Sequence, residues 1–395
     1  MKIVLSIEVI LPPLAGIGRY AWELATRAPL HPEVEEMRFM SDGRWASLPD
    51  IGGEARGVEQ ASSSVKSSFR TKLTSVARQQ LGRIPLVSRL YGQVMPKLVA
   101  GQLEKVEDAI FHGPNYFVPQ THLPTVVTIH DLSAYRYPQW HPKTRVDRMM
   151  RTIPESIQRA GLILTDSDAI RLELIQQFGV PADRLKTVLL GVDPIYFPRT
   201  EQQITPVLKQ FGLIDKQYSL FVSTIEPRKN LLNLLAAYRA LPLDLRQHYP
   251  LVLVGSRGWQ SDAIHTQIEI GVQEGWLKYF GYVEQPLLPY LYAGCRLFTY
   301  PSWYEGFGLP IAEAMASGVP VLTSDTSSMP EVAADAALLV NPADVEQIKE
   351  GLQRGLEDQH WRAQAIAQGL QRAAQLTWDA CVQNTVAAYK TVSAR

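Results

Sequence analysis

Two glutamates and two glycines surround the start of a helix that we expect in the second half of the chain. Pro310 suits the beginning of this helix and Gly318 its end, so we place it at about 310–317, with Glu313 in its first turn. A glycine loop at the positive end of a helix exposes backbone N–H groups, which suits a diphosphate. Carboxylates on either side can hold ribose and hexose hydroxyls. Alternatively, Glu313 only balances the helix dipole and Glu305 is solvated. The residues before the helix read Glu305-Gly306-Phe307-Gly308-Leu309.

A pair of cations, Arg228 and Lys229, lies between an expected strand at 218–224 and a helix that begins at Leu231. Positive side chains at the N-terminus of a helix oppose its macrodipole, at a cost of roughly a few tenths of a kcal/mol. We therefore expect an anion between this pair and the helix, unless the pair is solvated by chance. Phosphate fits, because arginine offers it a bidentate fork and lysine a point charge.

Polar residues also end two strands expected in the first half. His130 follows the apolar run 124–129, and open α/β sheets place ligand groups at the carboxyl ends of their strands. We take His130 as a candidate site residue, with a structural histidine as the alternative. The segment Phe111-His112-Gly113-Pro114-Asn115 ends another expected strand and is a weaker candidate for lining a ligand pocket.

Gly16 and Gly18 follow the first expected strand and open a helix. The turn lacks the third glycine of the dinucleotide-binding fingerprint, and no acidic residue ends a second strand at the expected distance. This argues against an NAD-dependent oxidoreductase. A plain turn and a phosphate-facing loop both remain open.

Asp166-Ser167-Asp168 superficially matches an Asp-x-Asp metal motif. Asp and Ser are also favoured N-caps, and a helix at 169–178 follows directly. We therefore expect these residues to cap the helix. Nothing else in the sequence requires a metal, so we expect no metal site.

Short apolar runs that alternate with amphipathic helical stretches must position these residues. This rhythm predicts an α/β protein with parallel sheets covered by helices, and 395 residues suit two domains. We place one domain at 1–191, a polar connection at 192–217, a second domain at 218–375, and at 376–395 a helix that could pack back on the first domain. The expected strands are 2–9, 108–112, 124–129, 161–165, 186–190, 218–224, 250–254, 277–280, 295–300, 319–323 and 337–340.

Three motifs taken together resemble the retaining glycosyltransferases of family 4, which have the GT-B fold. These motifs are the Glu305 and Glu313 pair within Tyr-Glu-Gly-Phe-Gly-Leu-Pro, the Glu-Pro-Arg-Lys-Asn run, and Gly281-Tyr282-Val283. Their order and spacing match over essentially the whole C-terminal half. The resemblance implies two Rossmann-like domains that face each other across a cleft.

The resemblance also implies roles for single residues. Catalytic roles fall to His130 on the donor sugar, to Glu305 near that sugar, and to Arg228 and Lys229 on the diphosphate. Glu313 would hold the ribose, and the backbone at Tyr282 and Val283 would meet the base. Further donor contacts would come from the loops that contain Gly16, Gly18, Gly306, Phe307, Gly308 and Leu309.

The activity implied is transfer of a hexose from a nucleotide-sugar, with no cofactor besides this co-substrate and no metal. The Thr-Ile-Glu-Pro-Arg-Lys-Asn run resembles bacterial mannosyltransferases of O-antigen and polysaccharide synthesis, which favours GDP-mannose as donor and a lipid-linked saccharide as acceptor. A GDP-deoxyhexose or UDP-glucose donor and a nucleotide-sugar epimerase of the same architecture are the alternatives.

Charge and cysteine distribution limit the partners and the compartment. Basic and acidic residues both number 39, but residues 62–105 hold eight basic side chains against one acid, interleaved with apolar ones. Such a stretch can lie on anionic lipid or form a solvated helix face. A non-catalytic adaptor at a lipid surface is a further alternative for the function of the protein. Binding of nucleic acid is disfavoured because no recognition motif is present. We expect no signal peptide and no membrane span, buried free thiols at Cys295 and Cys381, and a cytoplasmic protein, peripheral on the inner face of the membrane.

Overall fold

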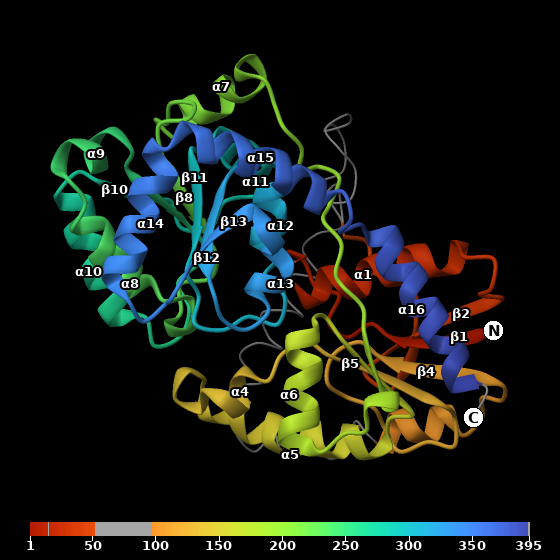
Figure 1. Ribbon diagram of the computed structural model, residues 1–395. Coiled ribbons are helices and arrows are strands. Elements are labelled where there is room, and N and C mark those ends of the chain that lie inside the picture. The colour runs from red at the N-terminus through yellow and green to blue at the C-terminus, as the bar shows by residue number, and fades with distance from the viewer. Residues whose placement is uncertain (15, 52–96, 394–395) are drawn as a thin grey trace, which may run out of the picture. The chain divides into compact units, whose positions relative to one another are not determined.

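The computed structural model describes residues 1–14, 16–51 and 97–393 (Figure 1). Contacts divide the chain into two compact units. The first unit comprises Met1–Thr128, Asp147–Leu164 and Thr385–Arg395, and the second comprises Ile129–Val146 and Thr165–Asn384. The domain limits 1–191, 192–217, 218–375 and 376–395 stay a prediction. The expectations for 62–96 lie outside the described residues.

A seven-stranded sheet has the order β3-β2-β1-β4-β5-β6-β7. β1 pairs in parallel with β2 and β4, and β4 with β5, whereas β3 is antiparallel to β2. β4 and β5 are buried along their whole length, as expected for strands covered on both faces. The strands are β1 (Lys2–Ser6), β2 (Glu36–Ser41), β3 (Arg44–Ala46), β4 (Ala109–Gly113), β5 (Thr125–Ile129), β6 (Leu162–Thr165) and β7 (Leu185–Thr187).

A second sheet of six strands has the order β10-β9-β8-β11-β12-β13 and is parallel throughout. β8 pairs in parallel with both β9 and β11. The strands β8 and β11 are far apart in the sequence, but as parallel neighbours they end at the same edge of the sheet. The strands are β8 (Ser219–Val222), β9 (Leu251–Val254), β10 (Leu277–Tyr279), β11 (Leu297–Tyr300), β12 (Val321–Ser324) and β13 (Ala337–Val340). Each corresponds to a strand expected from the sequence.

Helices cover the sheets, and in the second unit α8 and α14 pack against each other beside the six-stranded sheet (Figure 1). The helices are α1 (Ile17–Arg27), α4 (Ser133–Arg136), α5 (Lys143–Arg159), α6 (Asp168–Phe178), α7 (Glu201–Gln210), α8 (Leu231–Arg239), α9 (Leu243–His248), α10 (Asp262–Gln273), α11 (Leu288–Gly294), α12 (Leu309–Ala316), α13 (Met329–Ala333), α14 (Val345–Glu357), α15 (Gln359–Ala373) and α16 (Trp378–Ser393). Single 3-10 turns are η1 (Ala28–Leu30), η3 (Pro138–Trp140), η4 (Ala182–Arg184), η5 (Pro227–Lys229), η6 (Gln285–Leu287) and η7 (Ala334–Ala336).

A buried polar chain connects α16 to the first unit's sheet. The Tyr389 hydroxyl lies 2.7 Å from His112 Nδ1, and His112 Nε2 lies 2.9 Å from Thr128 Oγ1. The Tyr20 hydroxyl lies 3.0 Å from the same Thr128 oxygen. His112 is fully buried and bonded through both ring nitrogens. It is therefore a core residue, so the expectation that the segment 111–115 lines an acceptor pocket is wrong for His112 and stays a prediction for the rest of the segment.

Both cysteines, Cys295 and Cys381, are buried free thiols, as predicted. Burial raises the pKa of Cys295 to about 12, so this thiol stays protonated and unreactive. Among the helices that the structure describes, none is both long and apolar enough to span a bilayer.

Candidate functional site

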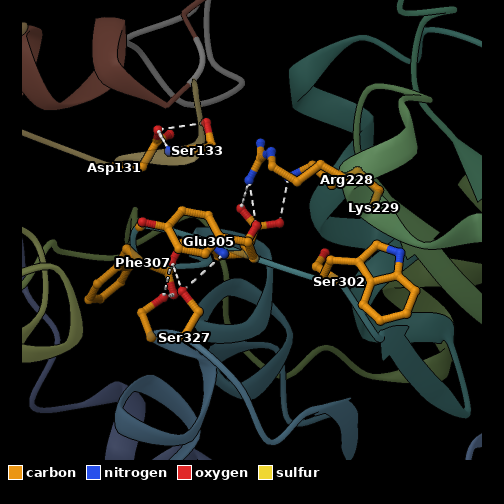
Figure 2. Close-up of polar contacts among 12 residues, drawn as sticks. Asp131, Ser133, Arg228, Lys229, Ser302, Glu305, Phe307 and Ser327 are labelled. Atoms are coloured by element: carbon orange, nitrogen blue, oxygen red, sulfur yellow. Dashed lines mark hydrogen bonds and ion pairs between the residues drawn. The ribbon is translucent and has the colours of Figure 1, made fainter. Parts of the chain in front are cut away.

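Glu305 is the centre of the candidate site, in the loop between β11 and α12 of the second unit. Its carboxylate is 6% exposed and accepts two charged hydrogen bonds, at 2.6 Å from Lys229 Nζ and at 2.7 Å from Arg228 Nη1 (Figure 2). The Glu305 N–H donates to the Ser327 hydroxyl, and its carbonyl accepts from the hydroxyls of Ser327 and Ser328. The backbone of Glu305 is therefore fixed as firmly as its side chain.

Each cation has further partners that hold its head group in place. Arg228 donates from Nη1 to the Tyr304 carbonyl at 2.7 Å and from Nη2 to Glu226 Oε1 at 2.9 Å. Lys229 Nζ donates to the Tyr300 hydroxyl at 2.8 Å. Both cations lie in η5, which follows β8, so the neighbouring strands β8 and β11 bring the two motifs together.

The charges keep one another ionised. Burial by itself raises the pKa of Glu305, but Arg228 and Lys229 outweigh burial and lower that pKa to about 2. For Arg228, burial lowers the pKa, and the carboxylates of Glu305, Glu226 and Asp131 reverse this and raise it. At neutral pH the site therefore holds a deprotonated Glu305 between two protonated cations.

This arrangement changes the sequence argument about the cation pair. The pair was expected to need an anion because it precedes a helix, and a ligand phosphate was the anion considered. The structure shows that Glu305 supplies an anion from within the chain. Glu305 is therefore not a solvated residue, and the solvated-pair alternative for Arg228 and Lys229 is wrong as well, because both are largely buried.

Helix α12 begins one residue earlier than predicted. Gly308 is its N-cap with φ 99°, a conformation that favours glycine, and Pro310 is its second residue. Glu313 is the fifth helical residue, so its placement in the first turn was wrong; its Oε2 accepts a hydrogen bond from the Tyr292 hydroxyl at 2.9 Å. Gly318 has φ 71° just past the helix end, as predicted. Among the described residues no side chain caps α12; Pro310 has no N–H and the Ile311 N–H donates to the Gly308 carbonyl, so the Leu309 N–H is the helical amide left for an anion.

Gly306 is required by the close approach of another backbone segment. A Cβ atom at this position would lie 1.9 Å from the His130 carbonyl oxygen, a distance no side chain tolerates. The Gly306 carbonyl accepts from the Ser167 hydroxyl at 2.8 Å. Phe307 and Leu309 complete the loop, and the Phe307 carbonyl accepts from the Ser328 hydroxyl.

His130 is buried at the end of β5 and pairs with Asp166 at the end of β6. Its Nδ1 lies 2.7 Å from Asp166 Oδ2. Burial raises the pKa of Asp166, against the opposing effect of His130. Asp166 is thus a partner of His130, while Ser167 is the N-cap of α6 and accepts from the Ile170 N–H. The capping prediction is confirmed for Ser167.

Asp131 follows His130 and stands near the cations. Its Oδ1 accepts from the Ser133 N–H at 2.9 Å and from the Ser133 hydroxyl at 2.8 Å (Figure 2). Burial alone raises the pKa of Asp131, but Arg228, Arg145 and the bonds from Ser133 lower it. Asp131 therefore adds a further carboxylate to the surroundings of Arg228.

The remaining predicted donor residues are Gly16 and Gly18 in the first unit and Tyr282 and Val283 in the second unit. Gly16, with φ 48°, is the N-cap of α1 in the first unit, and a Cβ at Gly18 would lie 2.8 Å from the Val9 carbonyl oxygen. In the second unit, Tyr282 is exposed, and Val283 is buried beside it. The structure places these residues without testing their roles, which stay predictions.

Several residues of the site were missed from the sequence. Glu226, Tyr300, Asp166 and Ser327 contact candidate residues directly, and of these Glu226 belongs to the Glu-Pro-Arg-Lys-Asn run but was given no role. Asp166 also had a signal, its place at the end of a buried strand, but it was interpreted as part of a cap. Across the described residues, no group of three or more His, Cys, Asp or Glu side chains could hold a metal ion.

Comparisons with known proteins agree with this arrangement. A family model described as "Glycosyl transferases group 1" matches residues 207–372, and one described as "Glycosyltransferase Family 4" matches residues 76–195. The O-antigen chain mannosyltransferase B of Escherichia coli is 43% identical over 390 residues, which cover 99% of this chain and 100% of the relative. The serotype-specific mannosyltransferase WbdA of Escherichia coli is 31% identical over 280 residues, 68% of this chain and 34% of its own length.

Among solved structures, Anabaena HepE in complex with UDP and glucose matches with a TM-score of 0.71 at 18% identity, over 99% of this chain and 100% of that chain. At this low identity, the structural likeness shows that the two chains share a fold. The family resemblance that the sequence motifs indicated is confirmed by the family models and by the 43% identical relative. The chain belongs to the glycosyl transferases of group 1, within glycosyltransferase family 4, and has the GT-B fold with two parallel-sheet α/β domains.

Proposed function

We propose that this glycosyltransferase transfers mannose from GDP-mannose to a saccharide acceptor, with retention of anomeric configuration and without a metal ion. The relative with 43% identity over 99% of this chain is named an O-antigen chain mannosyltransferase, and WbdA is named a mannosyltransferase. These names support an acceptor within an O-antigen or a related polysaccharide. A GDP-deoxyhexose or UDP-glucose is the alternative donor.

The observation that carries the proposal is the convergence of Glu305, Arg228 and Lys229 beside the uncapped N-terminus of α12. Preorganised donors and helix dipoles stabilise negative charge that grows in a transition state, because they need no reorganisation when the charge appears. The leaving group of a nucleotide-sugar is a nucleoside diphosphate, whose charge grows as the glycosidic bond breaks. This group of residues suits that leaving group.

In the proposed reaction the bond between the anomeric carbon and the diphosphate oxygen breaks, through a transition state that resembles an oxocarbenium ion. The acceptor hydroxyl attacks from the same face, and its proton passes to the leaving phosphate. Arg228, Lys229 and the backbone amides near Gly306 and Gly308 stabilise the diphosphate. Glu305 is ionised and so cannot donate a proton; it orients both cations, and His130, held by Asp166, contacts the donor sugar.

Calorimetry with GDP, UDP and ADP, followed by transfer assays with the matching mannose and glucose donors, tests the proposal. We expect GDP to bind at least tenfold more tightly than UDP or ADP, and GDP-mannose to transfer mannose in the presence of EDTA. Tighter binding of UDP would shift the donor to UDP-glucose. Failure of every nucleoside diphosphate to bind at millimolar concentration would refute the function, and epimerised donor without acceptor would indicate an epimerase.

We further propose that the acceptor is lipid-linked and that the basic stretch 62–105 binds the inner face of the cytoplasmic membrane. The support is its eight basic residues among apolar ones, each of which adds about 1 kcal/mol near an anionic surface. Cosedimentation with phosphatidylglycerol vesicles should exceed that with phosphatidylcholine vesicles and should fall with salt. Equal binding to both kinds of vesicle would contradict the membrane role.

A further inference from the structure

His141 stands out because it is buried without hydrogen-bond partners. The residue is 4% exposed, and neither Nδ1 nor Nε2 has a partner among the described residues. A buried polar atom without a partner costs about 1–3 kcal/mol, so two on one ring are an expensive feature that a fold rarely keeps without use. The neighbouring Arg145 also has a buried Nε that finds no partner in the described part of the chain.

The charged groups around His141 belong to the surroundings of the candidate site. Burial lowers the pKa of His141 to about 4, aided by Arg145 and Arg228 and opposed by Asp131. At neutral pH the ring is therefore neutral and offers one N–H donor and one acceptor nitrogen. A hydroxyl group also donates one hydrogen bond and accepts others, whereas a phosphate oxygen only accepts. A neutral imidazole thus suits hydroxyls better than it suits a diphosphate.

Aromatic rings form the rest of this neighbourhood. The Trp259 ring lies 6.0 Å from the His141 ring, and Trp259 Nε1 donates to the Trp140 carbonyl at 2.6 Å. Trp140 stacks on Tyr137 at 4.2 Å between centroids, and its other aromatic neighbour, Trp303, lies 6.2 Å away. These four aromatic residues are only half-buried. Flat apolar surfaces with a few convergent polar atoms are typical of sites for small organic ligands such as sugars.

The aromatic group adjoins the candidate site through the backbone. The Trp303 N–H donates to the Arg228 carbonyl at 2.9 Å, and Trp303 is separated from Glu305 by Tyr304 alone. A sugar bound near Arg228 and Glu305 would therefore have His141 and these rings within its surroundings.

We propose that His141, with Arg145 and the aromatic residues Tyr137, Trp140, Trp259 and Trp303, forms a saccharide subsite whose ring nitrogens bind hexose hydroxyls. The hexose is either the sugar of the donor or the terminal sugar of the acceptor. The inference rests on the proposed function, since it supplies the sugar-binding part of that site.

The test replaces His141 by phenylalanine, which keeps a flat ring against Trp259 and removes both nitrogens. Because these nitrogens have no partner within the described chain, the variant should fold as well as the wild type, checked by circular dichroism. His265→Phe is a matched control, since His265 in α10 is also buried, has no partner for its Nε2 among the described residues, and lies edge-on to Tyr279 of β10. If His141→Phe does not fold, His141→Leu takes its place.

Three quantities are measured for each variant: the Kd of GDP, the Kd of GDP-mannose, and kcat/KM for the acceptor. We expect His141→Phe to bind GDP like the wild type, and either to bind GDP-mannose at least tenfold more weakly or to lose at least tenfold in acceptor kcat/KM. The first result assigns the donor sugar and the second the acceptor. His141→Gln, which keeps a neutral donor and acceptor, should recover at least threefold of the loss.

Unchanged donor affinity and unchanged acceptor kcat/KM in folded His141→Phe would overturn the subsite. So would an equal loss in His265→Phe, or a His141→Gln variant no better than His141→Phe. If wild-type protein binds no nucleoside diphosphate, the proposed function fails instead, and the two failures are thus distinguishable.

Discussion

Glu305→Gln should remove a pH-dependent part of the stability of the second unit. The pKa of Glu305 is about 2 in the fold against 4.5 for an ordinary glutamate. A carboxyl whose pKa is lowered by folding stabilises the fold above its unfolded pKa and loses this contribution as the pH falls toward its folded pKa. The difference in pKa corresponds to roughly 3 kcal/mol, of which about 1.4 kcal/mol is lost between pH 7 and pH 3.5.

Glutamine at position 305 also leaves Lys229 and Arg228 buried with one anion fewer. Removing one partner of a buried ion pair costs about 3–5 kcal/mol, and Arg228 retains Glu226, so we expect the lower end of that range at pH 7. The destabilisation by Glu305→Gln should then shrink by about 1.4 kcal/mol at pH 3.5, because the wild type has lost that much and the variant cannot titrate.

Urea unfolding followed by tryptophan fluorescence measures this difference, since six of the eight tryptophans lie in the second unit. Glu350→Gln is the control, because Glu350 is exposed on α14 and reports the general effect of removing one negative charge. A destabilisation by Glu305→Gln that is the same at pH 7 and pH 3.5 would refute the charge arrangement described above.

Three further substitutions test single contacts of the site. Lys229→Met should lower kcat by about 100-fold, through lost stabilisation of the leaving diphosphate, with circular dichroism as the folding check; near-native turnover would exclude that role. Glu313→Ala should weaken GDP binding in calorimetry by about tenfold and leave pyrophosphate binding unchanged, and unaltered GDP affinity would exclude a contact with the ribose. Asp166→Asn should lower kcat by about tenfold or more with little change in the donor KM, because His130 loses its fixed orientation; an equal loss in Asp168→Asn would point to α6 instead.

The strands that are easiest to predict are those whose residues are all buried. β4, β5, β9 and β12 are continuous apolar or small runs, and such runs are visible without knowledge of the fold. β2 was missed because it is a partly exposed strand with charged residues at Glu36 and Arg38. Its pairing with β1 depends on where the chain returns after α1, which no local pattern records.

Helix α7 was missed for a different reason. Its prolines and polar residues indicated a connection at 192–217, and Pro206 lies inside the helix. A capping box between Thr200 and Gln203 fixes the helix start. This signal was present in the sequence, and the proline obscured it.

Glu305, Arg228 and Lys229 could be named from the sequence, but their pairing could not. Lys229 and Glu305 are 76 residues apart, and the sequence around each residue gives a reason for its presence without reference to the other. They meet because β8 and β11 are neighbours in the sheet, which is a property of topology. For the same reason, the sequence alone suggested that the anion beside the cation pair belongs to a ligand. The structure is needed to show that Glu305 lies there.

The charges around the cation pair decide which groups can attract a diphosphate. Glu305, Glu226 and Asp131 all act on Arg228, so the side chains alone carry no excess of positive charge there. The attraction must then come largely from fixed dipoles, those of helix α12 and of the Leu309 amide at its start. Dipoles at short range are screened far less by salt than a surface patch of lysines. It follows that GDP affinity should change little between 50 mM and 500 mM salt, and that a steep salt dependence would mean that the carboxylates move away from Arg228 when the nucleotide binds.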